Sequence, residues 1–242
     1  VARQVEAAGQ IQRRMIPASA PTIPGLGFGR VYDPSLQLSG DFYDFLELPE
    51  GRVGLVIADV VGKGLPAALM MASVRSALRG YAARPDLDVH EVVAAVNEYM
   101  VRDTKIGEFA TLVYGVFSDD GHRFRYCNAG HDAPLLFRDD RFVELTTGGM
   151  VLGVRSQEPF EADTIELAAG DLLVLTTDGV SEAISYEGEA YGRERLYASL
   201  RKHRELDPQP LARQILWDVR RFVGLAEQSD DITIVVVKAA SR

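Results

Sequence analysis

The 242 residues suffice for one large domain with its own hydrophobic core, and 47% apolar with 25% charged residues is typical of a globular chain. The formal charge of −9, from 26 Lys and Arg against 35 Asp and Glu, argues against a surface that binds duplex nucleic acid, which needs clustered basic residues. Cys127 is the only cysteine, which excludes an intrachain disulfide and a cysteine-rich zinc site. No apolar run approaches the roughly 18 residues that span a bilayer, and we expect a cytoplasmic protein without a membrane segment.

The chain opens with a predicted amphipathic helix. Residues 2–15 contain helix formers with apolar or small side chains three to four positions apart, and Pro17 ends the run. The helix either packs on its own domain or continues an upstream connector and pairs with a second copy in a homodimer. Because the first residue is Val and not Met, we expect a fragment of a longer polypeptide. In this interpretation residues 1–17 are a linker or switch helix after an upstream sensor domain, and residues 18–242 form one further domain.

Short strands begin near Leu26, and helices interrupt them. Turn residues such as Pro49-Glu50-Gly51 and Asp119-Asp120-Gly121 separate the apolar runs. We predict strands at 28–32, 42–48, 52–59, 110–117, 122–128, 134–137, 164–167, 171–177 and 232–238, and helices at 67–83, 89–102, 194–203 and 210–223. The turns predict an antiparallel meander over the three strands between 110 and 137. The last strand is β-branched at nearly every residue and should be buried on both faces. Two blocks of strands with helices between them indicate an α+β fold.

Four aspartates adjoin strands with strongly apolar interiors, where a rigid scaffold presents functional groups: Asp41, Asp59, Asp178 and Asp230. If the four converge, unit charges about 4 Å apart repel by roughly 4 kcal/mol per pair. Either some carboxyls are then protonated, or divalent cations lie among them. Oxygen-only ligands favour Mg²⁺ or Mn²⁺, and a pair of such ions serves phosphoryl chemistry. The spacing along the chain does not establish that the four converge.

Five motifs, four of which contain one of these aspartates, follow one another along the chain. They are Ser39-Gly40-Asp41-Phe42-Tyr43-Asp44, Ala58-Asp59-Val60-Val61-Gly62-Lys63-Gly64-Leu65-Pro66-Ala67-Ala68, Asn128-Ala129-Gly130-His131, Thr177-Asp178-Gly179-Val180-Ser181-Glu182-Ala183 and Asp230-Asp231-Ile232-Thr233. In this order they resemble the motifs of bacterial PP2C-like phosphatases of the SpoIIE/RsbU type. The resemblance covers about residues 11–238, and any single motif would be weak support.

The resemblance implies a β-sandwich of two mostly antiparallel sheets flanked by helices, with a binuclear Mn²⁺ or Mg²⁺ centre. It implies hydrolysis of phosphoserine or phosphothreonine on a protein, typically a phosphorylated STAS-domain anti-sigma-factor antagonist whose dephosphorylation frees a sigma factor. By motif, Asp59 would bridge both metals and the carbonyl oxygen of Val60 would add a ligand. Asp41 would bind one metal, with Asp178 and Asp230 on the other, and Asp231 would support or cap the site. Ser39 departs from the family, which usually has Gly at this position.

Four further residues are candidates for a role in function or in structure. His131 is either a general acid for the leaving alkoxide or, as we favour, part of a turn shaped by Asn128 and Gly130. Lys63 is either a solvated loop charge or a contact for the substrate. Cys127 is predicted to be a small buried hydrophobe. Glu182 would cap or orient the site, and its function is unassigned.

The leading hypothesis is a metal-dependent phosphoprotein phosphatase. Metal-activated water would attack phosphorus directly, because no Cys or His nucleophile lies in a suitable motif. One alternative is a regulatory module that binds a partner without catalysis. Another treats Ser39-Gly40-Asp41-Phe42-Tyr43 as a diverged nucleotide cyclase signature, which leaves the Thr-Asp-Gly and Asp-Asp-x-Thr elements unexplained.

Overall fold

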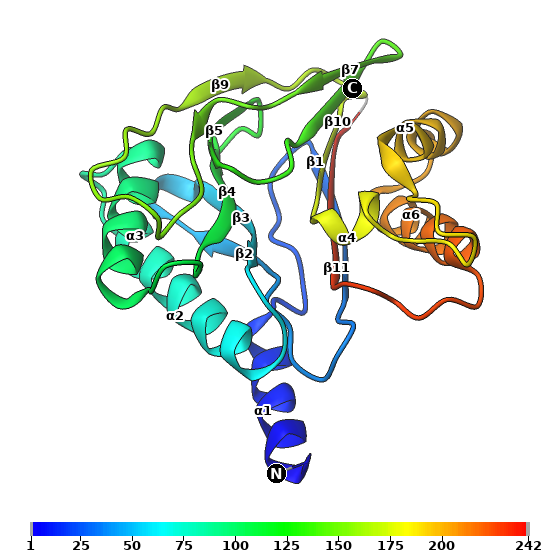
Figure 1. The fold of residues 1–242 in the computed structure, drawn as a ribbon. Helices are drawn as coiled ribbons and strands as arrows, with labels where there is room; N and C mark the ends of the chain where they lie inside the picture. Colours follow the sequence, from blue (N-terminus) through cyan, green and yellow to red (C-terminus); the bar gives the residue numbers. More distant parts are fainter. Residues whose placement is uncertain (1, 241–242) are drawn as a thin grey trace.

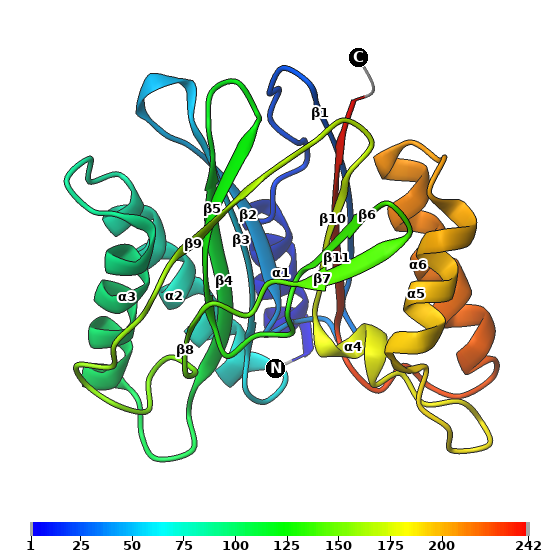
Figure 2. The same ribbon diagram turned by 90° about the horizontal axis from the view of Figure 1, so that it is seen from above.

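Two β-sheets pack face to face, and a layer of helices covers the outer face of each (Figures 1 and 2). The computed structural model describes residues 2–240. One sheet has the strand order β1–β11–β10–β6–β7: Leu26–Asp33, Ile232–Ala239, Leu172–Thr176, Leu135–Arg138 and Arg141–Glu144. The other has the order β2–β3–β4–β5–β8: Phe42–Glu47, Val53–Val60, Ala110–Phe117, Arg123–Ala129 and Gly148–Gly149. β9 (Asp163–Glu166) also pairs with β5. The predicted α+β sandwich of mostly antiparallel sheets is confirmed.

The helices divide between the two outer faces. α2 (Leu65–Ala82) and α3 (Val89–Asp103) cover the sheet that contains β3, whereas α5 (Gly192–His203) and α6 (Pro208–Val223) cover the sheet that contains β11 (Figure 2). α1 (Ala2–Met15) projects below the sandwich in Figure 1. α4 (Asp178–Ser181) is a single turn, and Pro49–Gly51 is a 3-10 turn between β2 and β3. Among residues 2–240, none of the helices is both long and apolar enough to cross a membrane. The expected cytoplasmic location stays a prediction.

The last strand is buried on both faces, as its sequence predicts. Val235 and Val237 face the core between the two sheets, whereas Ile234 and Val236 face the core beneath α5 and α6. This alternation follows the two-residue period of a strand. β11 therefore joins the two cores and holds its neighbours β1 and β10 in place.

The predicted meander over 110–137 is wrong in its third strand. β4 and β5 form the expected hairpin, but β6 pairs with β10 in the other sheet. The chain crosses between sheets after Gly130, whose φ of 67° is in the left-handed region. β6 then forms a hairpin with β7 through the turn predicted at Asp139 and Asp140, both at positive φ. The strand β7 itself was not predicted. Turn residues identify hairpins, but they do not show which sheet the next strand joins.

Asp44 ties β2 to α2 through a buried ion pair. Its carboxylate is fully buried and lies 2.9 Å from Arg75 Nε and 2.6 Å from Arg79 Nε. Removing one partner of a buried pair leaves the other charge uncompensated and costs about 3–5 kcal/mol. We expect Asp44→Ala to lower the free energy of unfolding by that amount in urea denaturation. Asp86→Ala, which removes the solvent-exposed partner of Arg84, is the control and should leave the urea midpoint unchanged; equal midpoints for both variants would contradict the expectation.

Candidate metal centre

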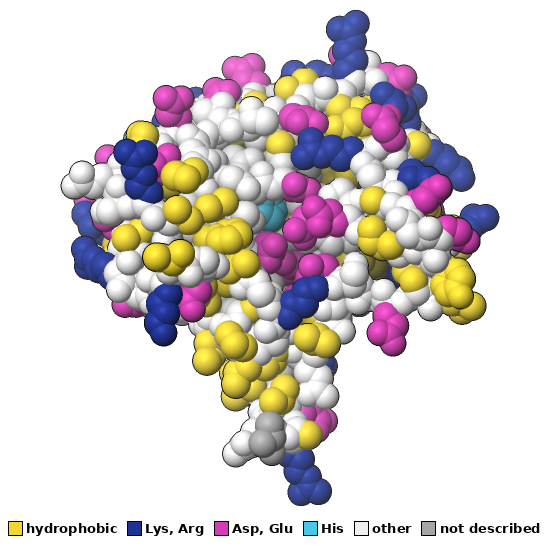
Figure 3. Space-filling view, in the orientation of Figure 1, with side chains coloured by type: hydrophobic (Ala, Val, Ile, Leu, Met, Phe, Trp, Pro, Cys, Tyr) yellow, Lys and Arg dark blue, Asp and Glu magenta, His cyan; other side chains and the backbone are white. Residues whose placement is uncertain are grey.

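The four predicted aspartates lie at one end of the sandwich. Asp41 directly precedes β2, and Asp59 is the next-to-last residue of the antiparallel strand β3. Asp178 begins α4 just after β10, and Asp230 lies two residues before the antiparallel strand β11. Since antiparallel neighbours start and finish at the same edge, each sheet brings two of the aspartates to this end. Acidic side chains gather in the centre of this face, between the two halves of the molecule (Figure 3).

Two glycines let the backbone segments of the site approach closely. A Cβ on Gly40 would lie 2.6 Å from the carbonyl oxygen of Val60, so the loop before Asp41 contacts the end of β3 directly. A Cβ on Gly179 would overlap the carbonyl oxygen of Asp231, so the start of α4 packs against the start of β11. These contacts bring Asp41 near Asp59, and Asp178 near Asp230. Only glycine fits at both positions.

Hydroxyl groups connect the two halves of the site. The Asp41 carboxylate accepts hydrogen bonds from Thr177 Oγ1 at 2.7 Å and from Thr233 Oγ1 at 2.8 Å. These threonines belong to the Thr-Asp-Gly and Asp-Asp-x-Thr motifs, to which the sequence assigned no role beyond their aspartates. Asp41 is 2% exposed. Its position is therefore fixed by residues of the opposite sheet.

Asp231 supports the loop before Asp41. Its carboxylate accepts hydrogen bonds from the backbone and hydroxyl groups of Ser35 at 2.7 and 2.8 Å, from Ser39 Oγ at 2.6 Å and from Gly40 N at 3.2 Å. Ser39 Oγ also accepts a hydrogen bond from Asp41 N at 3.0 Å. The geometry fits the supporting role expected for Asp231. The Ser39 hydroxyl makes hydrogen bonds here that the glycine usual in the family at this position could not make.

The carboxyls of the site repel one another. Burial, followed by the charge of Asp59, raises the pKa of Asp41 well above its usual value. Burial and the charges of Asp230 and Asp231 raise the pKa of Asp59 to about 6. Burial and the charges of Asp59, Asp230, Glu182 and Asp132 raise the pKa of Asp178 to about 7. Groups that shift one another in this way lie close together.

The donor set fits a hard divalent cation. Carboxylates and the carbonyl oxygen of Val60 are the oxygen ligands that Mg²⁺ and Mn²⁺ prefer. Across residues 2–240, no three His, Cys, Asp or Glu side chains already surround a single point as metal ligands do. Asp230 is instead held by Lys63, whose Nζ lies 3.2 Å from Asp230 Oδ2 and donates a hydrogen bond to the carbonyl oxygen of Ser229. The amine thus supplies the positive charge beside Asp230.

His131 lies in the turn where the sequence placed it. The Asn128 side chain closes this turn, accepting a hydrogen bond from His131 N at 2.8 Å and donating one to His131 O at 3.0 Å. His131 Nδ1 lies 2.7 Å from Thr111 Oγ1, and Thr111 pairs with Asp59 across β3 and β4. Burial lowers the pKa of His131 to about 4. The contact of Nδ1 with Thr111 supports the structural interpretation, whereas Nε2 is buried without a hydrogen-bond partner among the described residues.

The structure also places the two remaining sequence candidates, Cys127 and Glu182. Cys127 is fully buried in β5, and burial raises its pKa to about 12, as expected of a small hydrophobe. Glu182 follows α4, where its backbone N–H donates to the carbonyl oxygen of Asp178 at 2.7 Å. Its carboxylate contributes to the acidic cluster through its charge on Asp178.

Gln12 connects α1 to the site, a contact that the sequence did not predict. Its side-chain amide donates to Ser39 O at 2.8 Å and accepts from Ser39 N at 3.0 Å. Gln12 is buried on the packed face of α1, between Ala8 and Met15. The sequence feature that could have indicated this contact is the position of Gln12, a polar residue, among the apolar and small residues of the predicted helix.

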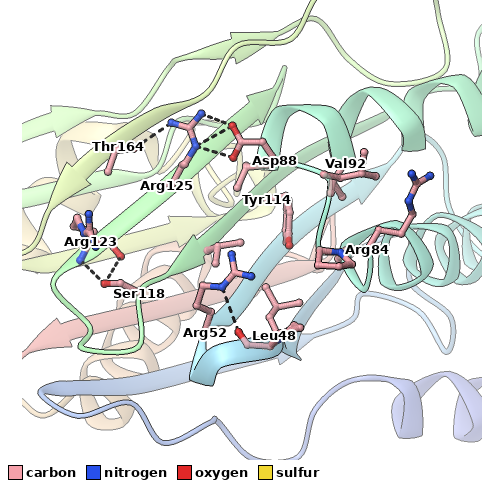
Figure 4. A pocket seen from close by; sticks show the side chains of 16 residues that line it. Leu48, Arg52, Arg84, Asp88, Val92, Tyr114, Ser118, Arg123, Arg125 and Thr164 are labelled. Atoms are coloured by element: carbon pink, nitrogen blue, oxygen red, sulfur yellow. Dashed lines mark hydrogen bonds and ion pairs between the residues drawn. The ribbon is translucent and has the colours of Figure 1, made fainter.

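One cavity lies at the opposite end of the sheet from the aspartates. It measures about 220 Å³ and lies between the β2–β3 turn, β4, β5 and the α2–α3 connection. Figure 4 shows the Arg125–Asp88 ion pair on one side, and Arg52 and Tyr114 facing the interior. Its charged side chains are mainly arginines, so it offers no set of metal ligands. The chemistry described above is confined to the acidic end.

Comparisons with known proteins agree with this geometry. The sequence model of the family "Stage II sporulation protein E (SpoIIE)" matches residues 49–240. Phosphoserine phosphatase RsbU of Bacillus subtilis is 28% identical over 239 residues, covering 97% of this chain and 70% of that protein. Protein IcfG of Synechocystis is 28% identical over 261 residues, covering 97% of this chain and 41% of its own length.

Solved structures share the fold. The SiaA-PP2C domain of Pseudomonas aeruginosa superposes with a TM-score of 0.85 at 20% identity, covering 98% of this chain and 96% of that one. A Mycobacterium tuberculosis structure of RsbU and RsbW domains gives a TM-score of 0.77 at 28% identity, covering 94% of this chain and 64% of that one. The catalytic domain of the phosphatase PstP, solved with two manganese ions, gives a TM-score of 0.66 at 18% identity, covering 89% of this chain and 99% of that one. The sandwich described above is therefore the PP2C fold, and with four-fifths of its length matched by the family model the chain belongs to the SpoIIE family.

Proposed function

We propose that this chain is a protein serine/threonine phosphatase that uses two Mn²⁺ or Mg²⁺ ions. Asp41, Asp59, Asp178, Asp230 and the carbonyl oxygen of Val60 would hold them, with Asp59 bridging the pair. The observation that carries the proposal is the cluster of mutually repelling carboxyls at one end of a PP2C fold. When bound, the ions supply positive charge for the phosphoryl group and acidify a water that can attack phosphorus.

The chain's own residues orient this chemistry. Thr177 and Thr233 both donate to Asp41 Oδ2, which leaves Oδ1 available as a metal ligand. Asp231 and Ser39 fix the loop that presents Asp41. Lys63, at the rim of the site and 44% exposed, can exchange its contact with Asp230 for a substrate phosphate oxygen.

The proposed substrate is a phosphorylated STAS-type anti-sigma-factor antagonist. Similarity to proteins named phosphoserine phosphatase, RsbU and RsbP of Bacillus subtilis, supports a phosphoserine protein as substrate. The test is release of phosphate from a phosphorylated STAS-domain protein with and without millimolar Mn²⁺. We expect turnover only with the metal. No turnover in Mn²⁺, together with tight partner binding that is indifferent to Asp substitutions, would favour a non-catalytic partner-binding module.

We further propose that residues 1–17 act as a switch helix for an upstream sensor and that α1 pairs with a second copy. Val1 lies outside the described residues. Gln12 offers a direct route from α1 to the loop before Asp41, and Ile11 on the same helix is 55% exposed. Light scattering tests the pairing: a dimer whose mass falls to that of a monomer in Ile11→Asp supports it, and a monomeric wild type contradicts it.

Gln12→Ala tests the connection between α1 and the site. Loss of both hydrogen bonds to Ser39 frees the loop before Asp41, and we expect kcat to fall about tenfold because misplaced supporting residues typically cost 10- to 100-fold. The control is Gln10→Ala, an exposed residue on the same helix. Equal kcat for the two variants in the Mn²⁺-dependent assay would rule out control of the site through Gln12.

A further inference from the structure

A second cavity adjoins the acidic cluster on the side of α4 and α6. It measures about 320 Å³ and lies between α4, the end of α6 and the loop that leads to β11. One side of its wall is apolar, with Ala183, Val219, Val223 and Ile232, whereas Arg220 and the loop residues Glu227, Gln228, Ser229 and Asp230 make the other side polar. The apolar side of this wall suits an uncharged side chain, which is stabilised by burying its apolar surface there.

The cavity borders the proposed catalytic site. Asp230 forms part of its wall, and Gly179 in the same wall directly follows Asp178. A phosphorylated residue with its phosphate at the aspartates would therefore place neighbouring residues of its own chain at the mouth of this cavity.

The wall of the cavity is firmly held. Gln228 Nε2 donates to the carbonyl oxygens of Asp33 and Asp230, both at 2.8 Å. Arg220 Nη2 lies 2.8 Å from Asp33 Oδ2. These contacts brace the loop between α6 and β11 against the end of β1. A braced wall lets a ligand bind with little loss of conformational freedom.

Apolar side chains are exposed around the opening. Ile184, in the cavity wall, is 41% exposed. Tyr186 and Leu225, on the two loops that flank the cavity, are 80% and 97% exposed. Exposed apolar groups next to a functional site indicate contact with a partner.

We propose that this cavity binds an apolar side chain of the phosphoprotein substrate, a few residues from the phosphorylated serine or threonine. The proposal rests on the proposed phosphatase function and adds a specificity determinant to it. The cavity would select substrates by the residue it buries, whereas the aspartates act on any phosphate that reaches them.

Phosphoserine peptides test the proposal. Each peptide carries one leucine at a position from −4 to +4 in a Ser/Gly background, and kcat/KM is measured with Mn²⁺. We expect leucine at one position to raise kcat/KM about tenfold over the leucine-free peptide, as burial of one such side chain would. A flat profile across all positions would overturn the proposal.

Variants locate the effect. Ile184→Ser removes part of the wall and Ala226→Phe fills the cavity, so both should reduce the tenfold gain from leucine to less than twofold. The matched control is Val143→Ser on β7, a 51% exposed residue outside the cavity, which should keep the gain. A gain that survives in both cavity variants would also refute the assignment.

The two hypotheses fail differently. If wild-type protein with Mn²⁺ hydrolyses neither the peptides nor p-nitrophenyl phosphate, the phosphatase function itself is wrong. If it hydrolyses p-nitrophenyl phosphate but shows no leucine preference, only the cavity assignment is wrong.

Discussion

Replacing Asp59 by Asn is expected to abolish both Mn²⁺ binding and phosphatase turnover. Asp59 is the carboxylate proposed to bridge the two ions, and it lies within reach of the charges of Asp41, Asp178 and Asp230. Loss of a shared ligand removes both ions, so kcat/KM should fall on the order of a thousandfold or more. Near-normal hydrolysis of a phosphoserine protein by this variant would refute the assignment.

The same substitution should stabilise the metal-free protein at neutral pH. The pKa of Asp59 is raised from 3.8 to about 6, mainly by burial, so protonated Asp59 is favoured in the folded chain. This contribution to stability is fully present below pH 3.8 and is lost as the pH rises through 6. Asn does not ionise, and at pH 7 the free energy of unfolding of the variant should exceed that of the wild type by on the order of 1–3 kcal/mol.

Thermal unfolding with and without Mn²⁺ separates these effects. Mn²⁺ should raise the Tm of the wild type, because it binds only the folded chain, and it should leave the Tm of Asp59→Asn unchanged. Asp86→Asn, at an exposed position, is the control and should respond as the wild type does. A variant less stable than the wild type at pH 7 without metal would contradict the account of a carboxylate destabilised by burial and by its acidic neighbours.

Gly40→Ala is expected to cause the second largest loss of activity. The added methyl group would lie 2.6 Å from the carbonyl oxygen of Val60, so either the loop before Asp41 or the end of β3 must move. Both Asp41 and the Val60 carbonyl are proposed ligands, and displacements near 1 Å can cost about 100-fold in rate. We expect the Mn²⁺-dependent kcat/KM to fall by about that factor.

Gly80→Ala is the matched control. Gly80 lies within α2, and no atom lies within 4 Å of where its Cβ would be. Since Ala is the better helix former, this variant should be fully active and slightly more stable. Wild-type activity in Gly40→Ala would show that the close contact with Val60 has no role in the site.

Much of the fold could be predicted because local patterns and burial agree. The turn at Pro49–Gly51 gave the β2–β3 hairpin, and the β-branched run of β11 predicted a strand buried on both faces. The assignment of β6 to the other sheet could not be predicted, because it depends on where the chain crosses after Gly130. The short strands β7 and β8 carry too few residues for a recognisable period.

The candidate site was likewise predictable only where local sequence patterns determine it. The four aspartates were identifiable because each adjoins an apolar strand, and their order along the chain resembled a known family. Their supports were not identifiable, because the contacts of Asp41 with Thr177 and of Ser39 with Gln12 join residues far apart in the sequence. Such contacts depend on the tertiary fold, which no local pattern encodes.

Diffraction from crystals grown with Mn²⁺, with anomalous data collected near the manganese edge, tests the central claim most directly. The account predicts two anomalous peaks roughly 3.5–4 Å apart, bound by Asp41, Asp59, the Val60 carbonyl oxygen, Asp178 and Asp230, with Lys63 released from Asp230. Crystals in millimolar Mn²⁺ that show no peak among these residues would contradict it.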